Sequence, residues 1–478
     1  MSESPPQVHP YMTWFEVDEA AIHRVLSEAM SRGADFADLY FQHSQSTSLS
    51  LEDGIVNRAN TGVDRGVGIR AVIGDQVGYA FSENLGIDAM LVAARTAATI
   101  ADSGAKLPPQ EIHLIDSPDY YPTARVWEEV DTTERLPLLQ KTESAARALE
   151  ESIEKVSVHW SDSDERVLIA TSDGRLCADR RPMAILSCQI TAAKNGVHQS
   201  NFASYARRDG IETFDDERIQ AICREAVDRT MLLFEAQRPP AGELPVVLAA
   251  GASGILLHEA IGHGLEADFN RKGTSIYSTL MDQQVAPDFV TMVDDATIPN
   301  DRGSLNVDDE GSPTERTVLI EDGVLRSYLH DRISANHYGI PSTGSGRRQT
   351  FRHVPMPRMR STYMLGGPHT RDEIIAAVDR GIIAETFTNG QVQIGAGDFT
   401  FYIKNGWLIE GGKVTAPIKD VNIIGNGPDA LRDVQMAADD MEIDMASWTC
   451  GKNGQGAPVS QGLPTVLVKS LTVGGVND

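Results

Sequence analysis

One stretch of the chain brings together residue types that hydrolytic metal sites use. The segment AGASGILLHEAIGHGLEADF places His258, Glu259 and His263 in an H-E-x-x-x-H pattern. Imidazoles are common zinc ligands, and a zinc hydrolase needs three protein ligands with a fourth position open to water. A glutamate beside the first histidine is where zinc-peptidase helices carry the general base, which passes a proton from water to the leaving amine. The segment therefore predicts a zinc hydrolase with His258 and His263 as ligands and Glu259 as base.

The spacing of the two histidines differs from that of the usual motif. In H-E-x-x-H the histidines are four residues apart, about 40° around a regular helix, so both face one metal. Five residues correspond to about 140°. We expect a helix that begins at Ser253 as N-cap and is widened by a single π-turn near Gly262, because only such a distortion lets both imidazoles reach one ion.

The third ligand must come from outside the histidine pair. Glu266 and Asp268 are local candidates, and Cys450 is a remote one. The cysteine begins the turn-rich segment CGKNGQG, where Lys452 would favour the thiolate that binds metal. The other three cysteines lie in apolar surroundings typical of buried residues. Ligand chemistry alone leaves Glu266 and Cys450 both open.

The composition excludes several classes of partner. The 478 residues include 42 Lys and Arg against 68 Asp and Glu, a formal charge of −26. Such a surface repels nucleic acid and anionic membranes, whose binding depends on contacts with Lys and Arg. The N-terminal residues lack the features of a signal peptide, and no run of 18 apolar residues occurs. We expect a cytoplasmic protein with reduced thiols and without a nucleic-acid or membrane partner.

The first half of the chain predicts an α+β domain. Apolar residues at helical spacing predict helices over residues 18–33, 88–102, 133–155 and 217–233. Alternating segments predict strands, with hairpin turns at Gly74-Asp75 and Asp173-Gly174. We expect the helices to cover a sheet, because the order of elements is not a strict βαβ repeat.

A break in this periodicity predicts a domain boundary. The segment EAQRPPAGE, residues 235–243, contains two prolines and a glycine. We expect an N-terminal α+β domain over residues 1–236 and a C-terminal β-rich, barrel-like metallopeptidase domain over residues 237–478 that carries one metal-binding helix. Its short strands are expected to turn at Asp322-Gly323, Asn405-Gly406 and Gly411-Gly412, with one further helix over residues 371–378.

Two polar segments in the second half resemble ligand-binding loops without matching them. TGSGRRQ, residues 343–349, lacks the Lys-Ser/Thr ending of a phosphate-binding loop. We expect a solvated turn, or a contact of Arg347 and Arg348 with the carboxylate of a peptide substrate. NVDDEGSP, residues 306–313, lacks the alternating acids of an EF-hand, so we expect a solvated loop.

Longer motifs resemble the PmbA/TldD family of metallopeptidases, on its TldD side. They are HEAIGHGLEAD, GSLNVDDEGSPTERTVLIEDGVLRSYLHDR, STGSGRRQ, PRMRSTYM, NGQVQIGAGDFTF and CGKNGQGAPVSQGLPTVLV, which cover most of residues 245–475. GVGIRAVIGDQVGYAFS extends the resemblance into the first half. Because the PmbA/TldE-type partner subunit lacks the H-E-x-x-x-H motif, the chain is similar to the catalytic subunit.

The resemblance implies properties that the residue chemistry leaves open. It implies a zinc site of His258, His263 and Cys450 with Glu259 as the catalytic base. It also implies a dimer that encloses the site, either with a PmbA/TldE-like subunit or with a second copy, and unfolded peptides or small unstable proteins as substrates. The alternatives are a zinc hydrolase of non-peptide amides and a regulatory binding protein.

Overall fold

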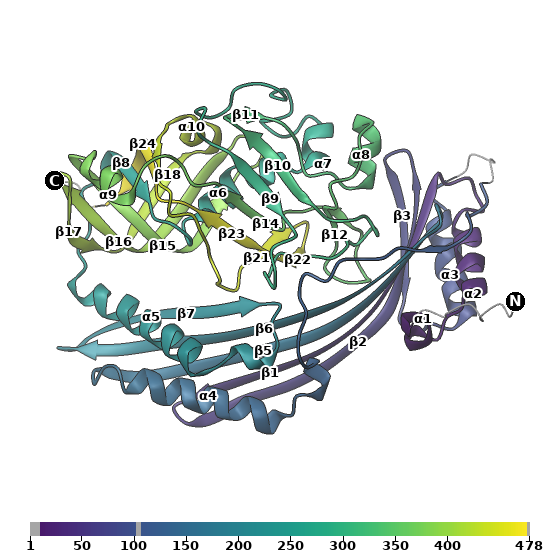
Figure 1. Ribbon diagram of the computed structural model, residues 1–478, viewed down its shortest axis with the longest axis horizontal. Coiled ribbons are helices and arrows are strands. Elements are labelled where there is room, and N and C mark those ends of the chain that lie inside the picture. The colour runs from purple at the N-terminus through teal and green to yellow at the C-terminus, as the bar shows by residue number, and fades with distance from the viewer. Residues whose placement is uncertain (1–9, 102–106, 476–478) are drawn as a thin grey trace, which may run out of the picture.

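A long antiparallel sheet forms the first part of the molecule (Figure 1). The computed structural model describes residues 10–101 and 107–475. The strands follow the order β3-β2-β1-β5-β6, and β7 pairs with β6 beyond them, while the short β4 runs parallel to the start of β6. Their bounds are β1 Phe36–Glu52, β2 Ile55–Ile73, β3 Gln76–Ser82, β4 His113–Leu114, β5 Ile153–Thr171, β6 Arg175–Lys194 and β7 Val197–Arg207.

Helices cover one face of this sheet. Successive side chains of a strand point to opposite faces, and Leu39 and Phe41 of β1 pack in the core that α2 and α3 contribute to. Trp160 of β5 packs with α4 and α5 farther along the same face. Tyr40 points the other way, onto Phe351 of the second part of the chain. The bounds are α1 Pro10–Phe15, α2 Glu19–Ala29, α3 Ile87–Ala98, η1 Trp127–Glu129, α4 Thr132–Arg147, η2 Ile211–Thr213 and α5 Asp216–Glu235.

Most elements expected in the first half are present. Asp18 caps α2 by accepting a hydrogen bond of 2.7 Å from the Ala21 N–H, and both expected hairpin turns join strands. The helix expected over 133–155 is too long, because α4 ends at Arg147 and residues 153–155 already belong to β5. The helix expected over 88–102 ends at Ala98, and residue 102 lies outside the described residues.

The second part of the chain contains a closed five-stranded barrel, so the β-rich, barrel-like expectation is confirmed. Its strands follow the order β15-β8-β24-β18-β16, and β16 pairs back with β15. Two further strands attach to it, β17 to β16 and β19 to β24. The bounds are β8 Gly242–Leu248, β15 Arg380–Val392, β16 Asp398–Glu410, β17 Lys413–Ile418, β18 Val421–Asn426, β19 Val434–Ala437 and β24 Val466–Gly474.

A six-stranded sheet and two small hairpins lie beside the barrel (Figure 1). The sheet strands are β9 Met292–Asp295, β10 Arg316–Glu321, β11 Val324–Leu325, β14 Ser361–Met364, β20 Glu442–Ile443 and β23 Ser460–Leu463. The hairpins are β12 Gly346–Arg347 with β13 Met356–Pro357, and β21 Thr449–Lys452 with β22 Gln455–Pro458. The helices are α6 Gly254–Ala260, η3 Gly262–Leu265, α7 Ala267–Arg271, α8 Arg332–Tyr338, α9 Arg371–Ala376 and α10 Gly427–Arg432.

One turn expected in the second half is wrong. Asn405 and Gly406 lie inside β16, whereas turns do occur at Asp322-Gly323 and Gly411-Gly412. A Cβ on Gly406 would lie 2.3 Å from the carbonyl oxygen of Ile383 on the paired strand β15. The glycine therefore permits close approach of two barrel strands, which local turn chemistry does not predict.

The acidic segment 306–313, expected to be a solvated loop, is buried except for its last residue. Arg181 of β6 donates to Asp309 over 2.6 Å, and Arg70 of β2 donates to Glu310 over 2.7 Å. Buried charges persist in folded proteins when they are paired. This segment therefore supplies the carboxylates that neutralise arginines on the face of the sheet opposite its helices.

The two parts meet along this face, and α5 leads through residues 236–241 into the first barrel strand. The boundary between residues 236 and 237 stays a prediction.

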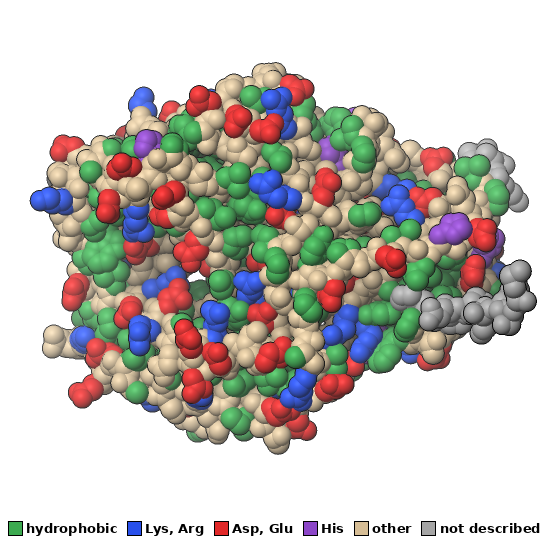
Figure 2. Space-filling model, viewed as in Figure 1, with side chains coloured by type: hydrophobic (Ala, Val, Ile, Leu, Met, Phe, Trp, Pro, Cys, Tyr) green, Lys and Arg blue, Asp and Glu red, His purple; other side chains and the backbone are tan. Residues whose placement is uncertain are grey.

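Figure 2 shows acidic and basic side chains interspersed on the visible face of both parts, with a hollow between the two parts. Within residues 10–101 and 107–475, no helix is long and apolar enough to cross a bilayer.

Candidate metal centre

The helix that carries the H-E-x-x-x-H motif is broken rather than widened. α6 ends at Ala260, Ile261 adopts φ −125° and ψ −52°, and a 3-10 turn, η3, carries His263. The expectation of a π-turn is therefore wrong. The break nevertheless brings the two imidazoles together, with ring centroids 5.2 Å apart and planes at 82°.

The glycines around the break are required by packing. A Cβ on Gly262 would lie 2.2 Å from the Met359 sulfur, and one on Gly264 would lie 2.7 Å from the Tyr277 ring. Met359 comes from a segment distant in the chain and Tyr277 from the segment that follows α7, so the shape of the break depends on tertiary contacts. The glycines let the 3-10 turn pack against both side chains.

Ser253 holds the start of the helix in a way the sequence does not predict. It stands at the N-cap position, but its hydroxyl makes no capping bond and donates to the Ala384 carbonyl of β15 over 2.9 Å. Gly254 packs directly on β23, because a Cβ there would lie 2.8 Å from the Gly462 nitrogen. α6 is thereby fixed between the barrel and the six-stranded sheet.

Cys450 of β21 joins the two histidines. One donor atom from each of His258, His263 and Cys450 lies within 4.8 Å of the others, and all three residues are buried. The Cys450 Sγ is 3.4 Å from His263 Nε2. Both ring nitrogens of His258 are buried without a hydrogen-bond partner among the described residues. Buried polar atoms are normally paired, so these nitrogens, an imidazole and a sulfur form a donor set that fits a metal ion.

The electrostatic surroundings favour the thiolate of Cys450. Burial acts to raise the pKa of this thiol, but the adjacent His258 and His263 outweigh it and lower the pKa to about 4. A metal-binding cysteine must be deprotonated. The cluster therefore contains cysteine in the thiolate form that binds metal.

Glu266 lies behind His263 rather than in the donor cluster. Its Oε2 is 3.0 Å from His263 Nδ1 and 3.1 Å from Lys452 Nζ. Burial acts to raise the pKa of Glu266, but Lys452 and His263 lower it to about 2. A carboxylate on one ring nitrogen fixes the orientation of a histidine and leaves the other nitrogen for metal. Lys452, expected to act on the thiolate, instead pairs with Glu266 and with Asp268, the latter over 2.7 Å.

Glu259 lies beside the donor cluster at the wall of a small cavity. The cavity measures about 110 Å³ and is also lined by His258, Cys450 and Gln461, with apolar walls formed by Ile255, Phe387, Phe401 and Val459. The Glu259 side chain is 25% exposed, and its Oε2 lies 3.8 Å from His263 Nε2. The carboxylate is thus open to solvent and adjacent to the donor cluster. Gln461 lies within the segment CGKNGQGAPVSQGLPTVLV, but its residue type and spacing did not indicate a functional role.

Arg347 and Arg348 do not join this site. Residues 343–348 are buried, so the expected solvated turn is wrong. Arg347 donates to the carbonyls of Met359 and Pro458, over 2.6 and 2.7 Å. Arg348 donates to the Asp309 carbonyl over 2.8 Å. Neither lines the cavity, and the contact of Arg347 and Arg348 with a substrate carboxylate stays a prediction.

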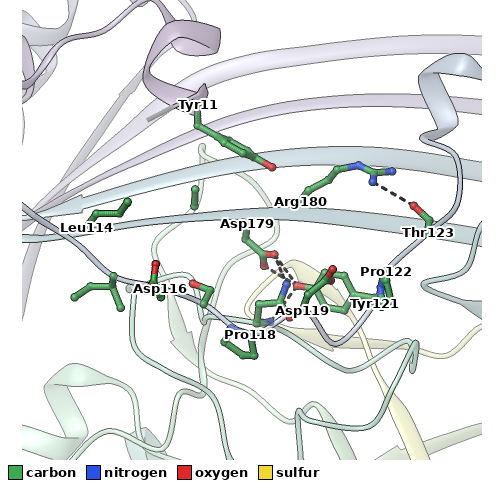
Figure 3. A pocket seen from close by; sticks show the side chains of 14 residues that line it. Tyr11, Leu114, Asp116, Pro118, Asp119, Tyr121, Pro122, Thr123, Asp179 and Arg180 are labelled. Atoms are coloured by element: carbon green, nitrogen blue, oxygen red, sulfur yellow. Dashed lines mark hydrogen bonds between the residues drawn. The ribbon is translucent and has the colours of Figure 1, made fainter. Parts of the chain in front are cut away.

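A larger hollow of about 360 Å³ lies beside the long sheet (Figure 3). The residues that line it include no histidine or cysteine. The Tyr121 hydroxyl donates to both oxygens of Asp179, over 2.8 and 2.7 Å, and Arg180 donates to Thr123 over 3.2 Å. These four side chains are thus paired, whereas both ring nitrogens of His258 in the histidine and cysteine cluster lack a partner among the described residues.

Models of one protein family match successive parts of the chain. Three successive models match, described as PmbA/TldA metallopeptidase domain 1 over residues 37–101, the central domain over 125–234 and the C-terminal domain over 241–475. A metalloprotease TldD homolog of Haemophilus influenzae is 40% identical over 453 residues, 93% of this chain and 94% of that protein. A zinc metalloprotease TldD homolog of Saccharolobus solfataricus is 27% identical over 457 residues, 95% of this chain and 99% of that protein.

Solved structures share the fold at low identity. TldE from Thermococcus kodakarensis matches with a TM-score of 0.76 and 19% identity, covering 95% of this chain and all of that one. A putative modulator of DNA gyrase from Thermotoga maritima matches with a TM-score of 0.78 and 20% identity, again over 95% of this chain and all of the other. Three domain models match in order, and a relative is 40% identical over 93% of this chain. The chain therefore belongs to the PmbA/TldD family of metallopeptidases that its motifs resemble.

Proposed function

We propose that the protein is a zinc-dependent peptidase in which His258, His263 and Cys450 hold the metal and Glu259 is the general base. The observation that carries this proposal is the buried cluster of three donors, with both nitrogens of His258 unpaired, next to a partly exposed glutamate. The names of full-length relatives as metalloproteases support the same class of reaction.

The chemistry of the donor set favours zinc. Two imidazoles and a thiolate suit zinc better than magnesium or calcium, which prefer oxygen ligands. Three protein ligands leave one position for water or substrate. When bound, zinc would lower the pKa of water and polarise a carbonyl group. Glu266 holds the His263 ring in place, while Glu259 takes a proton from the attacking water and passes it to the leaving amine.

The substrates we propose are unfolded peptides and small unstable proteins. The donor cluster is buried and opens onto a cavity of only about 110 Å³, so a folded protein cannot bring a rigid surface peptide to it.

We further propose that the site is enclosed in a dimer, with a TldE-like subunit or with a second copy of this chain. The shared fold with a chain named TldE supports a partner of similar architecture.

A paired digestion tests the function. One small protein is offered in its stable form and as a destabilised variant of nearly the same sequence, together with small non-peptide amides, and products are mapped by mass spectrometry. We expect cleavage of the destabilised form, little of the stable form, and loss of activity on chelation. Preparations of the Glu259→Gln variant control for contaminating proteases. Equal rates on both forms would refute an enclosed site, and exclusive hydrolysis of the small amides would refute peptidase function.

A further inference from the structure

A buried glutamine side chain in the cavity wall has no hydrogen-bond partner. Gln461 of β23 is fully buried, and neither its Oε1 nor its Nε2 is paired within the described residues. Leaving a buried polar group unpaired costs about 1–3 kcal/mol. Because folded proteins pair nearly all such groups, an amide with both ends unpaired points to a partner outside the protein chain, such as water or substrate.

The backbone fixes this amide beside the donor cluster. Gln461 lies opposite Thr362 in the parallel pairing of β23 with β14. The next residue, Gly462, contacts Gly254 at the start of α6, the helix that carries His258. Gln461 lines the same cavity as His258 and Glu259. Figure 1 shows β23 alongside β14 and next to α6.

Two other polar side chains of the cavity wall already have hydrogen-bond partners. The Trp448 indole N–H donates to Asp444, and the Thr449 hydroxyl accepts from Arg302 over 3.2 Å. His258 and Cys450 belong to the proposed metal site. Most of the remaining wall is apolar. The Gln461 amide therefore offers an unpaired donor and an unpaired acceptor to whatever occupies the cavity.

We propose that Gln461 binds a main-chain peptide group of the substrate next to the metal. Its Nε2 donates to a carbonyl oxygen and its Oε1 accepts from an N–H, because a primary amide and a peptide group carry complementary donors and acceptors. This assignment rests on the proposed peptidase function and specifies its substrate as an extended peptide recognised through its backbone. Sequence selectivity then comes from the apolar walls, while Gln461 selects for the amide link itself.

The first test distinguishes substrate binding by Gln461 from a role of its side chain in stabilising the fold. Gln461→Met keeps the length of the side chain and removes the amide. Gln455→Met is the matched control, because both ends of the Gln455 amide are paired, with the Val354 carbonyl and the Gln349 N–H, each over 3.0 Å. We expect Gln455→Met to lower the thermal midpoint and Gln461→Met to leave it unchanged or raise it. A fall in midpoint for Gln461→Met as large as for the control would show a structural role and overturn the proposal.

The second test measures binding without cleavage. A short unstructured peptide labelled with fluorescein is titrated into zinc-loaded Glu259→Gln protein, with and without Gln461→Met. Loss of one or two hydrogen bonds should weaken binding about 10- to 100-fold at unchanged zinc content. Equal affinity of the two proteins, or no binding to either, would overturn the assignment of Gln461. Failure of the wild-type protein to cleave any peptide would instead overturn the peptidase function, because binding is read separately.

A third measurement locates the contact. Peptides in which one backbone amide at a time is replaced by an ester lose one N–H donor each. At the contacted position, the ester should weaken binding to the Glu259→Gln protein that keeps Gln461. In the protein that also carries Gln461→Met, the same ester should cause no further loss, because both changes remove the same interaction. Identical penalties in both proteins at every position would overturn the backbone contact.

Discussion

Cys450 and His263 are separated by 187 positions in the chain, yet the thiol Sγ lies 3.4 Å from the imidazole Nε2. The hairpin of β21 and β22 brings the cysteine to the broken helix that carries the histidines. The contact places a thiolate donor beside two imidazoles. The predictions on metal binding follow from this contact.

Cys450→Ala is expected to remove most of the bound zinc, because it deletes one of three donors. Elemental analysis of protein purified without chelators provides the measurement, with about one zinc per chain in the wild type. Cys188→Ala, a buried cysteine outside the cluster, is the control and should keep its metal. Full zinc in Cys450→Ala together with loss in Glu266→Ala would assign the third ligand to the local glutamate.

Glu266→Gln is expected to weaken zinc binding about 10- to 100-fold without abolishing it, because the amide holds the His263 ring less strongly than a carboxylate. Competition with a chromogenic chelator measures the affinity. Asp268→Asn, which alters the other acid paired with Lys452, should have a smaller effect. An unchanged affinity in Glu266→Gln would show that this carboxylate does not support the metal site.

Glu259→Gln is expected to keep its zinc and its thermal midpoint while losing about 10²- to 10⁴-fold in kcat, because the amide cannot accept a proton from water. Peptide cleavage under saturating conditions, followed with metal analysis on the same sample, is the measurement. Activity at the wild-type level would place the general base elsewhere.

Arg70→Met is expected to destabilise the protein by about 3–5 kcal/mol, because it leaves the buried carboxylate of Glu310 without its arginine and leaves Asp38 with Arg348 alone. Denaturant unfolding measures the change. Arg352→Met is the control, since Arg352 and its partner Asp64 are partly exposed and their salt bridge is worth about 0–1 kcal/mol. Similar losses in both variants would contradict a special role for the buried network between the sheet and the second part.

His330 is expected to destabilise the fold as the pH falls below 6.5. Burial lowers the pKa of this histidine to about 4, so the folded state binds fewer protons than the unfolded state between pH 6.5 and 4. Stability therefore rises with pH across this window and is lost on acidification, by about 3 kcal/mol at most.

His330→Phe should remove this part of the pH dependence, because a phenyl ring can occupy the place of the imidazole beside Tyr328 and Tyr338 without titrating. Thermal midpoints of variant and wild type are compared at pH 7 and pH 4.5. His337→Phe, at an exposed position on α8, is the control. A difference between variant and wild type that does not change with pH would contradict the prediction.

Several features of the fold could be predicted from local sequence. Asp18 caps α2, the Gly74-Asp75 and Asp173-Gly174 turns join strands, and the β-rich character of the second half appears as a barrel. The cap and the turns depend on residues that are neighbours in the chain, such as a side chain and the N–H groups three residues on. Such local patterns do not predict long-range contacts. Asn405-Gly406 has the composition of a turn, yet it lies within β16, where pairing with β15 decides the conformation.

The sequence by itself determined the chemical types at the candidate site: two imidazoles and a carboxylate in one short segment, and a cysteine in a turn-rich segment near the end. The tertiary structure decided how they meet. Met359 and Tyr277 pack against the glycines at the break after α6, so the helix ends where a π-turn was expected. The burial of Arg347 and Arg348 and the unpaired amide of Gln461 were likewise decided by packing between distant segments. The physical reason is that spacing along the chain specifies only local geometry, whereas burial and the pairing of polar groups depend on which remote segments occupy the surrounding space.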